Sequence, residues 1–167
     1  ALTEAQLALL WKLAAEPILC FDGDAAGERA AYRAALRALP LLKPGKSLRI
    51  VSLPKGEDPD SLVRRAGAGA FAAALAGARP LDEVVWLLEA SSGKHDTPER
   101  RAALAERVFA RAKEIEDRSV QDHYRSAFKR RLDALFQPAE KRPWQRPATR
   151  GKRGRGGWQP PAFSSPI

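Results

Sequence analysis

The sequence has no methionine, one cysteine and two histidines among its 167 residues. Because Cys20 is alone, an intrachain disulfide and a thiolate metal cluster are both excluded. With only His95 and His123 available, a histidine-based zinc site and a Ser-His-Asp triad are unfavoured. A bound metal ion would therefore depend on carboxylate oxygens, which favours Mg²⁺ or Mn²⁺ over Zn²⁺.

Long apolar runs and large apolar side chains are also scarce. No run approaches the ~18 residues of a membrane-spanning helix, and the first residues lack the pattern of a signal peptide. We therefore expect a cytoplasmic protein with no membrane partner, and the single cysteine fits a reducing compartment. Alanine supplies 31 residues and buries little area. The missing methionine and the start at Ala1 in mid-pattern lead us to expect part of a longer chain.

The net charge of +9 is concentrated at the C-terminal end. Residues 137–167 carry seven basic residues and one acidic residue, together with six prolines and four glycines. Such a segment buries too little apolar area to fold, so we expect a disordered linker. Trp144 and Trp158 alternate with basic residues, a pattern that can stack on single-stranded nucleic acid. We favour plain linker behaviour over that alternative.

The first half of the chain follows an α/β pattern. Thr3 begins a helix with a capping box, and the apolar run at residues 18–21 predicts a buried strand. An alanine-rich helix is expected at about residues 25–38, followed by a second strand at residues 48–53. The order strand, helix, strand predicts a right-handed parallel crossover. A parallel sheet normally needs more than two strands, so we expect further strands upstream.

From Pro80 the pattern becomes entirely helical. Before it, Asp58 caps a helix to about Gly67, and a further helix is expected at residues 68–76. After it, three amphipathic helices with short connections predict a small bundle over residues 80–136. A pattern that begins at Ser119 resembles a capping box for the third of them.

Two acidic pairs follow the two predicted strands. Asp22 and Asp24 come directly after the first strand, and Asp58 and Asp60 follow the second by a short loop. Ligands of open parallel sheets bind at the carboxyl ends of the strands. Four carboxylates that converge there repel one another unless divalent cations intervene. The pattern therefore predicts a Mg²⁺ site, with one or two ions, for phosphoryl transfer.

Each of these residues also has an interpretation without chemistry. Asp24 is equally suited to capping the helix that follows it, although this leaves Asp22 unexplained. Asp58 and the proline after it form a good helix start in any protein. Three nearby basic residues are weak candidates for phosphate contacts, with ordinary solvated surface as the alternative: Lys55, Arg64 and Arg65.

The two acidic segments resemble a known family. Residues 21–27 (FDGDAAG) resemble the second acidic motif of the TOPRIM fold, and residues 53–60 (LPKGEDPD) resemble the next acidic motif of bacterial replicative DNA primases of the DnaG type. The resemblance extends over residues 1–136. It implies the C-terminal part of a TOPRIM domain at residues 1–79, a helical subdomain at 80–136, and the disordered linker at 137–167.

The resemblance implies a function in DNA replication. Members of this family polymerise ribonucleoside triphosphates into short RNA primers on single-stranded DNA, with Mg²⁺ or Mn²⁺. It assigns Asp22, Asp24, Asp58 and Asp60 as metal ligands. The family's acidic glutamate, its zinc-binding domain and the domain that binds the replicative helicase are expected outside this chain. We therefore assign no catalytic residue within it and expect no primer synthesis from the chain alone.

Two other functions remain open at this point. A different TOPRIM enzyme, such as a topoisomerase or a recombination nuclease, shares the acidic motifs. A topoisomerase needs a tyrosine nucleophile, and Tyr32 and Tyr124 both fall on predicted helices that make poor candidates. The third possibility is a non-enzymatic helical module whose basic tail binds single-stranded nucleic acid.

Overall fold

The computed structural model describes residues 2–137. Its first helix, α1 (Glu4–Leu13), begins with the predicted capping box. The Thr3 hydroxyl accepts a 3.2 Å hydrogen bond from the Gln6 backbone N–H, and the Gln6 side chain accepts one of 2.9 Å from the Thr3 N–H. Two otherwise unpaired N–H donors are thereby satisfied, which fixes where the helix begins.

The sheet has three strands in the order β1, β2, β3. Strands β1 (Ile18–Phe21) and β2 (Arg49–Ser52) run parallel with Ile18 opposite Arg49, as the crossover predicts. Strand β3 (Arg79–Pro80) pairs antiparallel with β2 and was not predicted. A two-residue strand that contains proline has no alternating pattern for sequence analysis to detect.

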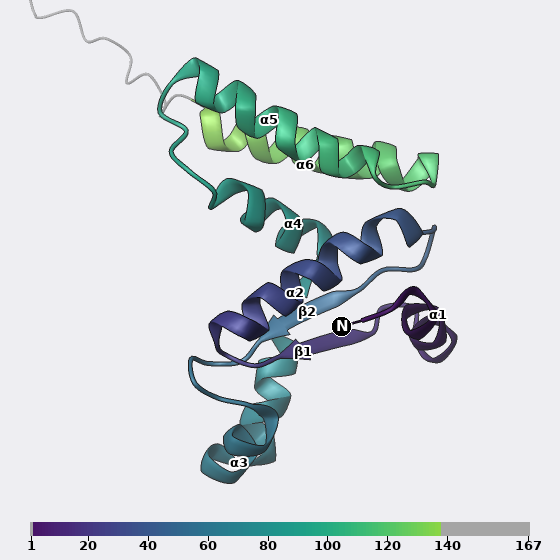
Figure 1. The fold of residues 1–167 in the computed structure, drawn as a ribbon, viewed down its shortest axis with the longest axis vertical. Coiled ribbons are helices and arrows are strands. Elements are labelled where there is room, and N and C mark those ends of the chain that lie inside the picture. The colour runs from purple at the N-terminus through teal and green to yellow at the C-terminus, as the bar shows by residue number, and fades with distance from the viewer. Residues whose placement is uncertain (1, 138–167) are drawn as a thin grey trace, which may run out of the picture. The chain divides into compact units, whose positions relative to one another are not determined.

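Helix α2 (Ala25–Ala38) connects β1 to β2 and lies along the sheet (Figure 1). Its buried side chains are all small: Ala31, Ala34, Ala35 and Ala38, with Gly27 in the first turn. A face without large side chains lets the helix backbone approach the strands closely. A 3₁₀ turn, η1 (Leu39–Leu41), ends this segment.

Helix α3 (Pro59–Ala76) begins after Asp58, with Pro59 at the first helical position. Gly67 interrupts it with φ 80° and ψ 168°, so two helical segments meet at a kink. The two helices predicted at 59–67 and 68–76 correspond to these segments. The kink requires glycine because side-chain-bearing residues rarely adopt a positive φ.

The predicted three helices after Pro80 are α4 (Leu81–Ala90), α5 (Pro98–Lys113) and α6 (Arg118–Phe136). Helices α5 and α6 lie side by side (Figure 1). The prediction that Ser119 caps α6 is wrong, because Ser119 lies inside the helix. The carboxylate of Asp117 instead accepts a 3.0 Å hydrogen bond from the Val120 N–H. This earlier start gives the helix two more residues, each of which adds a backbone hydrogen bond.

One hydrophobic core runs through residues on both sides of Pro80. Ile50 of β2 and Ala35 of α2 belong to it, as do Leu81 of α4 and Phe128 of α6. Residues up to Phe136 form one compact unit. The predicted domain boundary between residues 79 and 80 therefore crosses a shared core, and the division stays a prediction.

The α/β part followed by a helical bundle confirms the predicted fold class. Among residues 2–137, no helix combines the length and the apolar character that a bilayer crossing requires. The predicted disordered linker, with Trp144 and Trp158, falls on residues 137–167 and so lies outside the described residues except for Gln137.

Candidate metal-binding edge of the sheet

The two acidic segments lie against each other at the carboxyl ends of β1 and β2. The backbone N–H of Gly23 donates to the carbonyl of Glu57, and the N–H of Gly56 donates to the carbonyl of Gly23, both at 2.9 Å. The N–H of Leu53 donates to the carbonyl of Phe21 at 2.9 Å and extends the parallel pairing. Three backbone hydrogen bonds therefore join the segment around Asp22 and Asp24 to the segment before Asp58.

This close approach depends on two glycines. A Cβ atom at Gly23 would lie 1.8 Å from the carbonyl oxygen of Pro54, and one at Gly27 would lie 2.2 Å from the carbonyl oxygen of Asp22. Cβ atoms do not approach other heavy atoms closer than 3.0 Å, and both neighbours are backbone atoms. Gly23 therefore does more than separate two aspartates. Because it has no side chain, the loop that contains Pro54 and Glu57 packs directly against its backbone.

Two of the four aspartates cap helices. Asp24 Oδ1 accepts a 2.6 Å hydrogen bond from the Gly27 N–H at the start of α2. Asp58 Oδ1 accepts a 2.7 Å bond from the Ser61 N–H at the start of α3. The capping interpretation is therefore correct for both residues. Each cap uses Oδ1, and neither Oδ2 takes a hydrogen bond from residues 2–137, so both carboxylates keep a free oxygen.

The other two aspartates differ from each other. Asp60 forms a 2.9 Å ion pair with Arg64 one turn along α3, and both side chains are exposed. Asp22 is exposed and has no hydrogen bond or ion pair to any side chain in the described part of the chain. Burial raises the pKa of the neighbouring Cys20 thiol, and the negative charge of Asp22 raises it further. Cys20 therefore stays protonated, which agrees with a packing role and not a nucleophilic one.

No three histidine, cysteine, aspartate or glutamate side chains within residues 2–137 are placed to hold one metal ion together. The fold brings the two acidic loops together but does not gather all four carboxylates around a single point. Mg²⁺ usually keeps several waters and binds through only one or two carboxylates, so this oxygen-rich edge fits the ion by donor type. The assignment of all four aspartates as ligands stays a prediction.

Glu57 is a residue of this edge that the sequence analysis missed. Its side chain is only 15% exposed and accepts hydrogen bonds from the Ser61 hydroxyl and the Arg65 guanidinium. These two bonds, the Ser61 bond first, lower the pKa of Glu57. Ser61 and Arg65 share one face of α3, and Glu57 lies two residues before the helix begins, so the spacing of these three residues was the available signal.

The three residues predicted to contact phosphate fall into two groups, two with an acidic partner and one without. Arg64 is paired with Asp60 of α3, and Arg65 is paired with Glu57, which lies just before α3, so both arginines have a structural partner. Lys55 is exposed and has no ion pair among residues 2–137. Lys55 is the one of the three whose charge is free for a ligand at this edge.

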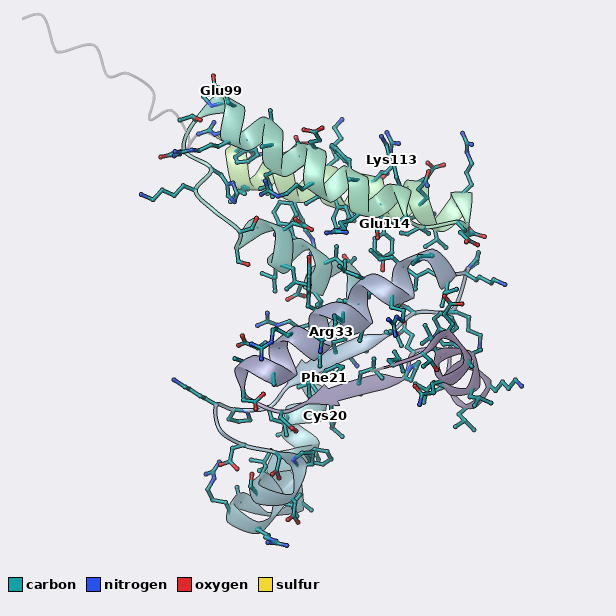
Figure 2. The ribbon with its side chains drawn as sticks, in the orientation of Figure 1. Cys20, Phe21, Arg33, Glu99, Lys113 and Glu114 are labelled. Carbon is teal, nitrogen blue, oxygen red and sulfur yellow. The ribbon has the colours of Figure 1, made fainter. Side chains whose placement is uncertain are left out.

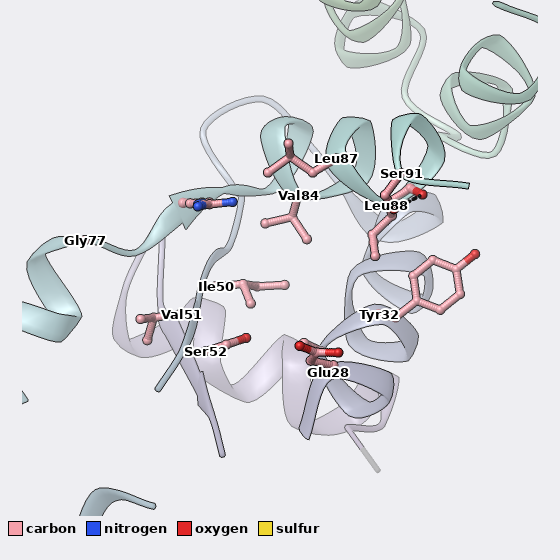
Figure 3. Close-up of a pocket in the computed structure, with 12 residues that line it drawn as sticks. Glu28, Tyr32, Ile50, Val51, Ser52, Gly77, Val84, Leu87, Leu88 and Ser91 are labelled. Atoms are coloured by element: carbon pink, nitrogen blue, oxygen red, sulfur yellow. Dashed lines mark hydrogen bonds between the residues drawn. The ribbon is translucent and has the colours of Figure 1, made fainter. Parts of the chain in front are cut away.

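A cavity of about 540 Å³ lies beside the end of β2, between α2 and α4 (Figure 3). Its apolar lining includes Ile50 and Val84, and its polar lining includes Glu28 and Tyr32 of α2 and Ser52 of β2. The sequence analysis did not predict it. Its lining comes from four elements, so no local pattern in the sequence indicates it.

Neither tyrosine has the features of a nucleophile. Tyr124 packs edge-to-face on Phe128, with ring centroids 5.8 Å apart. Burial, and then the charge of Asp82, raise the pKa of Tyr124 well above its ordinary value, which keeps the hydroxyl protonated. The Tyr32 hydroxyl lies 3.4 Å from the Arg111 guanidinium. The topoisomerase alternative therefore gains no support from the described residues.

Comparison with known proteins places the chain in a family. Residues 1–63 match the family model described as Toprim-like. The DNA primase of Rickettsia typhi is 36% identical over 129 residues, and that of Escherichia coli K12 is 34% identical over 133 residues. These alignments cover 77% and 80% of this chain but only 22% and 23% of the relatives. The chain thus spans less than a quarter of the curated relatives that it matches.

Solved structures match a similar share of the chain. A DNA primase domain from Pseudomonas aeruginosa is 36% identical, has a TM-score of 0.70, and matches 81% of this chain and 41% of that one. A DnaG primase catalytic domain bound to single-stranded DNA is 32% identical, also with a TM-score of 0.70, over 78% of this chain and 42% of that one. The chain therefore belongs to the family of bacterial DnaG-type DNA primases, and it corresponds to a segment of their catalytic core.

Proposed function

We propose that this chain is part of the catalytic core of an enzyme that makes short RNA primers on single-stranded DNA during replication. The relatives are named DNA primase, and one solved relative is bound to single-stranded DNA. The activity, the ribonucleoside triphosphate substrates and the bacterial cytoplasmic location are carried over from this kinship. A replicative helicase partner, reached through a separate C-terminal domain, belongs to the same proposal.

The observation that carries the proposal is the backbone junction between the two acidic loops. Hydrogen bonds of 2.9 Å from Gly23 to Glu57 and from Gly56 to Gly23 hold Asp22 and Asp24 beside the loop that leads to Asp58. Parallel strands that present carboxylates at one edge form the usual position for a ligand in an open α/β sheet. We propose that Asp22, Asp24, Asp58 and Asp60 bind Mg²⁺ or Mn²⁺ there.

The bound ion would neutralise the charge that develops on a transferring phosphoryl group. Residues of this chain would support ion and phosphate binding in two ways. Asp24 and Asp58 are fixed by the helix N–H groups that they cap, so their carboxylates do not need to be ordered when a ligand arrives. Lys55 places an unpaired positive charge on the loop between β2 and α3, where a nucleotide phosphate would approach.

The remaining parts of the chain take supporting roles in this proposal. Residues 1–79 would supply the TOPRIM part, residues 80–136 a helical subdomain that closes the core, and residues 137–167 the linker toward the helicase-binding domain. The inactivity of the chain alone stays a prediction.

Paramagnetic broadening by Mn²⁺ tests the site in the full 167-residue chain. At sub-stoichiometric Mn²⁺ we expect selective loss of backbone NMR signals from residues 22–24 and 56–58. Asp22→Asn should weaken the apparent affinity by about tenfold, because it removes a carboxylate ligand with no other partner in the described chain.

Asp133→Asn is the matched control. It removes the same charge as Asp22→Asn, and Asp133 is an exposed residue of α6 that lies more than 70 residues after the acidic loops in the sequence. It should leave the broadening pattern and the affinity unchanged. Broadening that is spread over the surface, or that persists unchanged in Asp22→Asn, would contradict the metal site.

A further inference from the structure

A second hollow, of about 270 Å³, lies between the connection from α4 to α5 and the part of α5 that ends at Arg107. We call it the α4–α5 hollow. No acidic side chain is among the residues that line it: Ser92, Gly93, Lys94, His95, Arg100, Ala103 and Arg107. Cations and polar groups therefore dominate its wall, although residues 81–136 carry no net charge.

The positive charges of this hollow are only partly neutralised. Arg100 Nη1 donates to Asp96 at 2.6 Å, and Arg107 Nε lies 3.3 Å from a Glu89 carboxylate oxygen. Lys94 is exposed and forms no ion pair within residues 2–137. A guanidinium has five N–H donors, so both arginines keep donors beyond these contacts.

Two buried nitrogen atoms that belong to residues lining this hollow have no hydrogen-bond partner in the described part of the chain. They are Nδ1 of His95 and Nε of Arg107, whose contact with Glu89 has ion-pair distance but not hydrogen-bond geometry. His95 Nε2 lies 2.8 Å from the carbonyl oxygen of Ala90. Because a carbonyl only accepts, Nε2 carries the hydrogen, and Nδ1 gains one only when the ring is protonated. A buried polar atom without a partner is uncommon in native proteins and points to a missing ligand or water.

The backbone around His95 is held in place. The Arg101 guanidinium donates to the His95 carbonyl at 3.2 Å, and the Ser92 hydroxyl donates to the Glu89 carbonyl at 2.7 Å. The connection from α4 to α5 is thus fixed at both ends, so the donors of the hollow are preorganised for a ligand.

We propose that the α4–α5 hollow binds one phosphate group. Lys94, Arg100 and Arg107 supply the positive charge, and His95 lines the same hollow. The volume of about 270 Å³ lies just below the ~300–1,000 Å³ of ordinary small-molecule pockets and is ample for a phosphate group. The phosphate comes either from the backbone of a nucleic-acid strand or from a free anion. This site is separate from the metal-binding edge and does not depend on it.

A titration with inorganic phosphate tests the proposal in the full chain, with sodium chloride at equal ionic strength as the reference. We expect saturable shifts of the Gly93 and Lys94 amide signals and of the His95 ring signals. Lys94→Gln should weaken binding by about five- to tenfold, since it removes one charge-assisted contact.

Lys113→Gln is the matched control, because Lys113 is exposed in the last turn of α5. The label at Glu99 in Figure 2 marks the first turn, so Lys113 lies at the opposite end of the helix. It removes the same charge from the same helix and should leave phosphate binding unchanged. Equal weakening in both variants, or shifts that chloride reproduces, would overturn the proposal.

A single-stranded oligothymidylate distinguishes the two sources of the phosphate. If a strand supplies it, the oligonucleotide should shift the same signals and compete with inorganic phosphate, and Lys94→Gln should reduce the slope of log affinity against log salt by about one. If a free anion is the ligand, the oligonucleotide should leave these signals unchanged while inorganic phosphate still binds. Binding of neither probe to the hollow would refute the proposal.

Discussion

At the scale of single residues, two of the four aspartates at the sheet edge combine a structural role with a proposed chemical one. Asp24 and Asp58 cap helices through one oxygen and keep the other free, so structural and chemical interpretations of the same residue are compatible. Asp22 lacks any such structural partner in the described chain. The case for chemistry is therefore strongest at Asp22, where no cap or ion pair explains the residue.

Gly23 is the residue on which the junction of the two loops depends most. Gly23→Ala should lower the free energy of unfolding by about 3 kcal/mol, because the new Cβ would lie 1.8 Å from a backbone oxygen that has no room to move. Gly69→Ala is the control, since a Cβ there meets nothing within 4 Å. It should leave stability unchanged or raise it by up to ~1 kcal/mol. Urea denaturation measures both, and an equal effect of the two substitutions would show that the close approach is unimportant.

Glu57 should make stability depend on pH in the acid range. The Ser61 and Arg65 hydrogen bonds lower its pKa below the ordinary value of 4.5. A carboxyl group with a lowered folded-state pKa stabilises the fold above its unfolded-state pKa and loses that contribution as the pH falls through the folded value. The difference in unfolding free energy between the wild type and Glu57→Gln should therefore be constant near pH 7 and shrink below about pH 4.5.

Glu106→Gln provides the comparison for that series, because Glu106 is exposed on α5 and has no ion pair within residues 2–137. Its difference from the wild type should stay near zero at every pH. A Glu57→Gln difference that persists unchanged at pH 3 would contradict the assigned hydrogen bonds.

At the scale of elements, helices with clear start signals were predicted well and the short strand was not. The capping box at Thr3 and the proline after Asp58 mark their helices locally, since the capping groups are within four residues of each other. Strand β3 exists only because Arg79 and Pro80 meet β2, and the Arg49 guanidinium donates to the Ala78 carbonyl at 2.6 Å beside it. No local signal encodes such a contact.

The start of α6 offers a direct test of the corrected cap. Asp117→Ala should lower stability by about 1 kcal/mol, because it removes the acceptor of the Val120 N–H. Ser119→Ala should change stability by less than about 0.5 kcal/mol, since Ser119 is an exposed residue inside the helix and alanine favours helix. Thermal or urea unfolding measures both, and the reverse order of the two effects would restore Ser119 as the cap.

At the scale of the whole described molecule, α2, α4 and α5 are tied together by a buried ionic cluster. The Glu89 side chain is 8% exposed, and its carboxylate accepts a 2.7 Å hydrogen bond from Arg111. Arg111 also reaches the Tyr32 hydroxyl of α2, and the hydrogen bond to Glu89 raises its pKa. The TOPRIM part and the helical part therefore share both a hydrophobic core and a polar contact.

This sharing predicts that the two parts unfold together. Trp11 lies in α1 and Trp86 in α4, one on each side of the proposed boundary. Trp144 and Trp158 are first replaced by phenylalanine, and two variants are then made that keep only Trp11 or only Trp86. Their urea midpoints, measured by tryptophan fluorescence, should be equal once the effect of each substitution on stability is corrected for. Circular dichroism on the same samples supplies that correction. Two separate fluorescence midpoints would show that residues 1–79 and 80–136 are independent domains.

The sequence by itself determined the order of the helices and of the two parallel strands, the pair of acidic loops at one edge of the sheet, and the family resemblance. These features depend on residues near one another in the chain: caps, breakers, apolar runs and two short motifs. Only the tertiary structure decided that Gly23 carries the second loop, that Glu89 and Arg111 link the two parts, and that Lys94, His95 and Arg107 surround one hollow. Such contacts join residues that the sequence separates, and they arise from the packing of whole elements, which no local pattern records.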